Sequence, residues 1–106
     1  MSAPECTHVG SIAITELPEE VAGCEECLAM GSPWCHLRMC LECGHVGCCD
    51  SSPNHHASTH AHQQGHPMIR SLQPGESWVW CYADRLMLTG VSLDGEPRIQ
   101  RSPLCP

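Results

Sequence analysis

The sequence has 106 residues, a formal net charge of −7, 10 cysteines and 8 histidines. A chain of this length forms one small domain, and with 3 tryptophans, 1 tyrosine and no phenylalanine it has few large side chains for an apolar core. The acidic balance excludes nucleic acid and an acidic membrane surface as expected partners, because both are recognised by basic surfaces. No segment is apolar over the length that a membrane span requires.

The amino-terminal residues 1–8 have neither a basic start nor an apolar run of signal-peptide length. They therefore favour a cytoplasmic location and reduced, metal-binding cysteines over a disulfide scaffold. Cys6 and His8 are the first candidate ligands. Residues two positions apart lie on the same side of an extended chain, so the pair can bind one ion, although a chance pair is an equal alternative.

Two C-x-x-C motifs follow, at Cys24–Cys27 and Cys40–Cys43. This spacing is typical of zinc knuckles. A thioredoxin-like redox pair is the alternative, but that pair expects a βαβ context that the sequence does not show. The alternating residues 34–39 predict a strand that leads into the second motif.

A helix is predicted over about residues 53–64. Ser52 is the expected N-cap, Pro53 suits the first helical position and Gly65 is the expected stop. His56 and His60 would lie one turn apart on one face of this helix.

The remaining chain predicts β-structure. Candidate strands are Met68–Leu72, Ser77–Tyr82, Leu86–Val91 and Arg98–Arg101, with turns at residues 73–76 and a hairpin turn at Asp94–Gly95. In the second strand Trp78 and Trp80 fall on one face, and Val79 and Cys81 on the other. We expect an α+β fold: a single zinc-stabilised domain over residues 1–106, with a twisted antiparallel sheet, one main helix, multiple zinc sites and a loose tail from about residue 102.

The ordered motifs C-x-H, C-x-x-C, C-x-x-C-x4-C, H-x3-H-x5-H and a late W-C-Y resemble the UBP-type zinc finger. This is the ubiquitin-binding module of some deubiquitinating enzymes and of one cytoplasmic histone deacetylase. The resemblance runs from Cys6 to about Asp84. The runs C-G-H-V-G-C-C-D-S-S-P-N and W-C-Y-A-D are similar to the bacterial branch of the family.

The resemblance implies three zinc ions. The implied ligand sets are Cys24, Cys27, Cys48 and His56; Cys40, Cys43, His60 and His66; and Cys6, His8, Cys81 and Asp84. Asp84 replaces the family's usual cysteine, and a carboxylate is an acceptable zinc ligand. His55 competes with His56 for the first set. Four protein ligands leave no coordination position for water, so the implied zinc is structural and the domain is not an enzyme.

In ubiquitin-binding members an aromatic pocket accepts the free carboxy-terminal Gly-Gly of ubiquitin, and an arginine pairs with its carboxylate. Trp80 and Tyr82 match two pocket positions, with ordinary sheet packing as the alternative. Asp50 stands at the position of the family's arginine, which weakens the case for ubiquitin. Arg38 stands where the family has a tryptophan, and it is a candidate replacement for the arginine. Two binding hypotheses follow. In the first, the cleft of Trp80 and Tyr82 with Asp50 binds a ligand that carries an amine, a guanidinium or a peptide chain end; in the second, Arg38 replaces the missing arginine and the cleft receives a ubiquitin-type carboxy-terminus.

Two further functions stay open. One is a purely structural or zinc-storing domain. The other is a redox or thiol-dependent enzyme that uses Cys49, because Cys49 precedes the predicted helix and a helix N-terminus lowers a thiol pKa.

The cysteines and histidines outside the ligand sets are Cys35, Cys49, Cys105, His36, His45, His55 and His62. Cys35 and His36 are neighbours on a predicted strand, so we expect them to point to opposite faces.

Overall fold

The computed structural model describes residues 12–73, 76, 78–88, 93, 95, 98–99 and 104. Its elements are β1 (Glu20–Val21), α1 (Glu25–Met30), β2 (Leu37–Cys40), β3 (Val46–Cys48), α2 (His56–Gln64), β4 (Met68–Ser71), β5 (Val79–Cys81), β6 (Leu86–Leu88) and β7 (Arg98–Ile99). Neither of the two described helices has the length and apolar character needed to cross a membrane.

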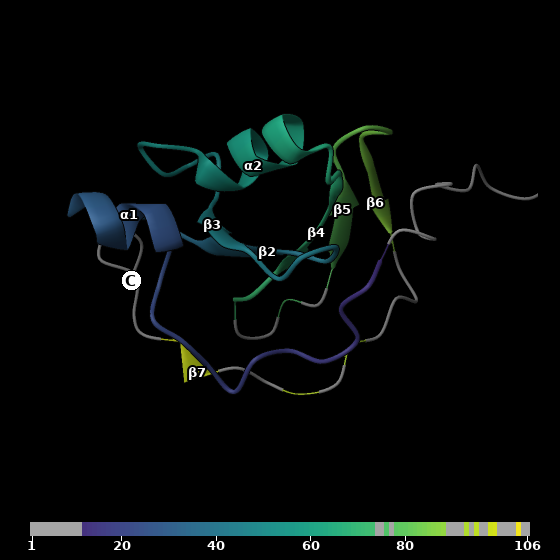
Figure 1. Ribbon diagram of the computed structural model, residues 1–106, viewed down its shortest axis with the longest axis horizontal. Coiled ribbons are helices and arrows are strands. Elements are labelled where there is room, and N and C mark those ends of the chain that lie inside the picture. The colour runs from purple at the N-terminus through teal and green to yellow at the C-terminus, as the bar shows by residue number, and fades with distance from the viewer. Residues whose placement is uncertain are drawn as a thin grey trace, which may run out of the picture.

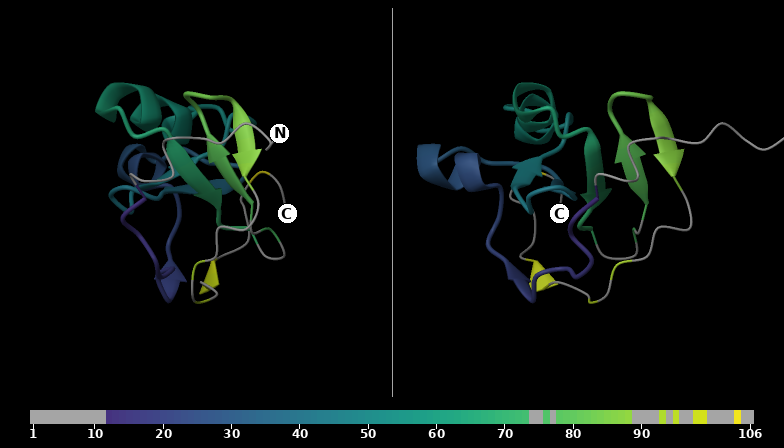
Figure 2. Two further views of the ribbon diagram at one scale, coloured as in Figure 1. Left: turned by 90° about the vertical axis from the view of Figure 1, so that its right-hand side faces the viewer. Right: turned by 45° about the vertical axis from the view of Figure 1, so that its right-hand side comes forward.

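Five strands form one antiparallel sheet in the order β3-β2-β4-β5-β6. Met39 lies opposite Val46 on one side and Arg70 on the other, and Trp80 lies opposite Ile69. Helix α2 packs on β3 and β2, and α1 packs beside β3 (Figure 1). The two views of Figure 2 show the short strands β1 and β7 apart from this sheet. The predicted α+β class with an antiparallel sheet is confirmed.

Helix α2 begins at His56 and not at Pro53, so the predicted start was wrong. His55 occupies the N-cap position with a left-handed φ of 51° and makes no side-chain cap. Ser52 is instead buried, and its hydroxyl accepts the N–H of Cys35 at 2.7 Å. The predicted end is confirmed: Gly65, with φ of 66°, donates its backbone N–H to the carbonyl of Ala61.

Two other features differ from the sequence-based expectation. The C-x-x-C motif that begins at Cys24 contains an unpredicted helix, α1, which ends at Gly31 in a left-handed conformation. Strand β7 pairs in parallel with β1, with Glu20 opposite Arg98, so the predicted hairpin was wrong. A hydrogen bond of 2.9 Å joins these two side chains across the strands. The turn residue Asp94 and the end of the predicted strand, residues 100–101, lie outside the described residues.

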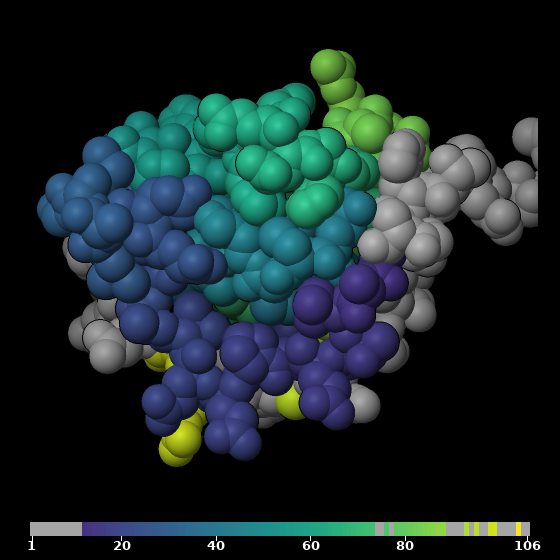
Figure 3. All heavy atoms as spheres, viewed as in Figure 1, coloured from purple at the N-terminus to yellow at the C-terminus, as the bar shows by residue number. Residues whose placement is uncertain are grey.

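The core combines aliphatic side chains with cysteine sulfur. Its fully buried members include Leu41, Met68, Val79, Cys24, Cys27, Cys48 and Cys81. The chain from residue 12 to β1, purple in Figure 3, crosses the lower part of the surface shown there. The N–H groups of Ala13 and Ile14 both bond to the carbonyl of Leu41 at 2.9 Å, which fixes this segment against the sheet.

Gly47 in β3 lies directly against the first turn of α2. A Cβ at this position would come within 2.7 Å of the backbone nitrogen of Ala57 and 2.9 Å of its Cα.

We expect Gly47→Ala to lower the free energy of unfolding by about 1–3 kcal/mol, because backbone atoms cannot move aside without shifting the helix. Denaturant unfolding of the zinc-loaded protein measures this. Gln63→Ala, on the exposed side of α2, is the control and should change stability by less than about 0.5 kcal/mol; equal losses would argue against the close contact.

Candidate metal centres and binding pocket

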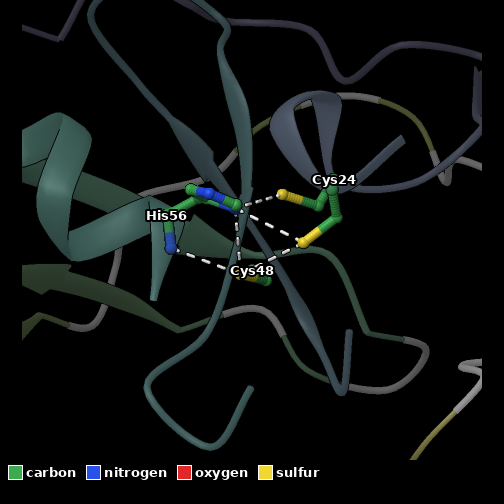
Figure 4. Close-up of side chains that lie close together, drawn as sticks. Cys24, Cys48 and His56 are labelled. Atoms are coloured by element: carbon green, nitrogen blue, oxygen red, sulfur yellow. Dashed lines mark hydrogen bonds between the residues drawn. The ribbon is translucent and has the colours of Figure 1, made fainter. Parts of the chain in front are cut away.

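The first cluster joins Cys24, Cys27, Cys48 and His56. His56 Nδ1 lies 3.2, 3.3 and 3.5 Å from the sulfur atoms of Cys24, Cys27 and Cys48, and the Cys27 and Cys48 sulfurs are 3.8 Å apart. Figure 4 shows Cys24, Cys48 and His56 converging on one point. They come from the start of α1, the end of β3 and the first residue of α2, so the cluster links three elements.

These distances fit one tetrahedral zinc ion. Bonds of about 2.3 Å to sulfur and about 2.0 Å to nitrogen place two sulfurs roughly 3.8 Å apart, and sulfur and nitrogen roughly 3.5 Å apart. Two groups also donate hydrogen bonds to the sulfurs: the backbone N–H of His56 to Cys48 at 3.2 Å, and the Asn54 side chain to Cys27 at 3.7 Å. Such donors favour the thiolate form that zinc requires.

The second cluster joins Cys40, Cys43, His60 and His66, whose donor atoms all lie within 4.8 Å of one another. Cys43 Sγ is 3.3 Å from His60 Nε2, and Cys40 Sγ is 3.6 Å from His66 Nδ1. Burial lowers the pKa of His60, and the neighbouring rings of His45 and His66 lower it further. His60 is therefore held in the neutral form that binds metal.

Burial also raises the pKa of three thiols in these clusters. Without a metal it raises the pKa of Cys24 to about 12 and that of Cys40 to about 11, and it raises the pKa of Cys48. At neutral pH these thiols therefore keep their protons until an ion displaces them.

A short chain of contacts joins the two clusters. Glu26, which lies between Cys24 and Cys27 on α1, has its Oε1 2.6 Å from Nε2 of His45. The His45 ring in turn stacks on that of His60, with centroids 4.0 Å apart and an interplanar angle of 8°. No role was predicted for His45 from the sequence, because its contact with Glu26 depends on how α1 packs against the loop before β3.

Of the two neighbouring histidines, His56 belongs to the first cluster, whereas His55 is exposed in its left-handed turn.

The third zinc ligand set that the resemblance implies is described only in part. Cys81 Sγ lies 3.8 Å from Asp84 Oδ2 and accepts the Asp84 backbone N–H at 3.4 Å, while Cys6 and His8 lie outside the described residues.

A third group of donor atoms, not expected from the sequence, consists of Cys35, His36 and Cys49. Residues 33–36 are irregular because β2 begins only at Leu37, so the neighbours Cys35 and His36 do not alternate as they would on a strand. Cys35 is disulfide-bonded. A disulfide at this residue was not predicted, because ligand spacing carries no information on cysteines outside the ligand sets.

A pocket of about 470 Å³ opens beside β5. Its lining combines three aromatic residues with charged and polar ones, namely His36, Arg38, Cys49, Asp50, Ser51, His62, Ile69, Trp78, Trp80, Tyr82, Arg85 and Met87. All four sequence-predicted ligand-binding residues are among them. Trp78 is the wall residue that the sequence analysis missed; its place on the same face as Trp80 was the signal that could have identified it.

Arg38 is fixed in this pocket. Its guanidinium carbon lies 4.6 Å from the centre of a Trp78 ring, and its Nη1 donates to the Leu37 carbonyl at 3.1 Å and to the Ser71 hydroxyl at 3.3 Å. A cation–π contact and two hydrogen bonds hold one nitrogen and one face of the guanidinium, which leaves other N–H groups for a guest.

Tyr82 and Asp50 share the pocket with Arg38. Burial raises the pKa of Tyr82 to about 12; the charge of Asp50 raises it too, and Arg38 opposes this. The Tyr82 hydroxyl is therefore protonated at neutral pH and can donate a hydrogen bond.

Cys49 has a different environment from the one that we predicted. Burial raises its pKa, but hydrogen bonds from the backbone of His36 and Ser51 and from the Ser52 hydroxyl, together with the charge of Arg38, outweigh burial and lower the pKa overall. The helix dipole is not the cause, because α2 begins seven positions later, at His56.

Two closed Cys/His clusters on a small antiparallel sheet define a zinc-finger domain. The chain belongs to the family of zinc fingers found in ubiquitin hydrolases and other proteins, whose family model matches residues 24–93, and the predicted resemblance is confirmed. It is a zinc-binding chain with up to three sites. Its structure is similar to the solution NMR structure of protein RPA1320 from Rhodopseudomonas palustris, with a TM-score of 0.74 and 46% identity over 94% of this chain and 98% of that one. None of the curated proteins compared with the chain matches it.

Acidification is expected to release zinc and to unfold the domain. The bound state is favoured at high pH and lost as the pH falls, because the thiols released on unfolding, with an ordinary pKa of about 8.5, take up protons. A site that exchanges three thiol protons loses affinity roughly a thousandfold per pH unit, and one that exchanges two roughly a hundredfold. The first cluster should therefore show the steeper dependence above the ordinary histidine pKa of about 6.5. Below it the histidines also take up protons, one in the first cluster and two in the second, so the two slopes become equal.

A zinc indicator used with a competing chelator from about pH 8 to about pH 4, together with amide NMR spectra over the same range, checks this expectation. A chelator at neutral pH should give the same collapsed spectrum. Amide resonances that stay dispersed after zinc removal would show that folding does not depend on the metal.

Replacement of His45 should weaken the second cluster selectively. His45→Ala removes both the stacking on His60 and the contact with Glu26, and loss of a group that orients a ligand typically costs 10- to 100-fold in metal affinity. Competition with a chromophoric chelator measures the affinity of each ion. His62→Ala, on the same helix, is the control. An equal loss at both clusters would indicate general destabilisation instead.

Proposed function

We propose that this chain is a non-catalytic zinc-stabilised module that binds a peptide or protein chain end in the aromatic pocket. The observation that carries the proposal is the position of Arg38, a guanidinium fixed on Trp78 inside a pocket that also contains Trp80 and Tyr82. Aromatic walls with a few placed polar groups are typical of ligand sites.

The charges favour a carboxyl end over an amino end. Arg38 is half-buried and held by three contacts, whereas Asp50 is exposed and its charge is screened by water. A guest carboxylate can accept the remaining N–H groups of Arg38 and the Tyr82 hydroxyl hydrogen. In this proposal Arg38 pairs with the guest carboxylate, as the family arginine does in ubiquitin-binding members.

Ubiquitin itself is not part of the proposal, because Asp50 occupies the position of that arginine and Arg38 enters the pocket from a different position in the chain. Catalysis is not proposed either. Each of the two complete clusters supplies four protein ligands, so a zinc ion there has no position left for water or substrate.

Calorimetric titration of the zinc-loaded protein tests the proposal. A short peptide that ends in free Gly-Gly should bind roughly 10- to 100-fold more tightly than the same peptide with an amidated end, as expected for hydrogen bonds to a charged group. Arg38→Gln should remove that difference, and Asp50→Asn should increase the affinity for the free carboxylate. Arg98→Ala is the control, because Arg98 is an exposed arginine outside the pocket.

Equal affinity for the two peptides would contradict a carboxylate site. If an acetylated amino end abolishes binding instead, Asp50 is the recognition residue and the guest is an amino end. Absence of binding by every peptide would favour the purely structural or zinc-storing alternative.

A further inference from the structure

The third group of donor atoms shares no residue with the two four-residue clusters. The donor atoms of Cys35, His36 and Cys49 all fall within 4.8 Å of one another. The backbone holds them there: the N–H of Cys49 bonds to the His36 carbonyl at 3.0 Å, and the N–H of Cys35 bonds to the buried Ser52 hydroxyl at 2.7 Å. Ser52 Oγ also lies 3.7 Å from Cys49 Sγ.

The donor types suit a soft, borderline metal. Two sulfurs and one imidazole match zinc sites that keep an open fourth position. His36 and Cys49 also line the aromatic pocket, so an ion bound by them would lie at the pocket wall. The arrangement differs from the two closed clusters, where the protein supplies all four ligands.

The disulfide prevents metal binding in the state that the structure shows. Cys35 is disulfide-bonded, whereas Cys49 is free and buried. The sulfur of a disulfide carries no thiolate charge and is a poor zinc ligand. Only the reduced form of Cys35 gives the group its second thiolate.

We propose that Cys35, His36 and Cys49 form a redox-gated zinc site at the wall of the pocket, with one coordination position open to a guest ligand. Reduction by a dithiol breaks the Cys35 disulfide: two electrons pass to its two sulfurs, each sulfur gains a proton, and the dithiol closes to a disulfide. Zinc then displaces the thiol protons of Cys35 and Cys49. Thiol–disulfide exchange with a small-molecule disulfide re-forms the Cys35 disulfide, reduces that molecule to its two thiols and releases the ion. The site does not depend on the proposed chain-end binding.

Native mass spectrometry of the full chain tests this by counting zinc ions before and after reduction. The reductant is a water-soluble phosphine, which is oxidised to its phosphine oxide as water supplies the oxygen and the two thiol protons. The reduced wild-type protein should hold one zinc ion more than the oxidised protein. Cys49→Ser and His36→Gln should retain the ions of the oxidised form and gain none on reduction. His62→Ala, which changes the same pocket outside the group, should gain the ion as the wild type does.

An unchanged zinc count on reduction overturns the proposal. A gain that persists in Cys49→Ser also overturns it, because the released thiol would then complete a site elsewhere, such as that of Cys81 and Asp84. His36→Gln keeps the test valid if Cys49→Ser does not fold. Cobalt(II) is a second probe: sulfur-to-cobalt charge-transfer absorption should increase on reduction in the wild type and not in His36→Gln.

Discussion

Coordination of one ion by Cys24, Cys27, Cys48 and His56 is the interaction on which the rest of the structure depends. The core contains few large apolar side chains, and cysteine sulfur fills much of its centre. Sulfur that is buried as a thiol contributes modest packing, but sulfur bound to zinc fixes the start of α1, the end of β3 and the start of α2 in one geometry. Folding and metal binding are thus expected to be one event, in which a structural ion contributes on the order of 10 kcal/mol or more.

Much of this arrangement could be predicted from the sequence, because zinc ligation has strict spacing rules. The C-x-x-C motifs and the one-turn separation of His56 and His60 identified the donors from local spacing. Their grouping into two sets of four was implied by the family resemblance, and the structure brings these sets together. The faces of β5 followed from the alternation of residues along a strand: Val79 and Cys81 are buried while Trp80 lines the pocket.

The errors concern interactions between distant segments. Ser52 satisfied every local rule for an N-cap, yet its hydroxyl bonds to the Cys35 backbone across the fold, and α2 begins later. Strand β7 has no local signal for a parallel partner at the other end of the chain. The disulfide state of Cys35 and the stacking of Arg38 on Trp78 likewise depend on tertiary contacts.

The contact of Glu26 with His45 couples the two closed centres. Glu26 lies between Cys24 and Cys27, so an ion in the first cluster fixes the turn that carries it. The carboxylate holds the His45 ring, and that ring stacks on His60 of the second cluster. Metal binding at either centre is therefore expected to raise the affinity of the other, because a coupling free energy acts equally in both directions. The two ions cooperate although they share no ligand.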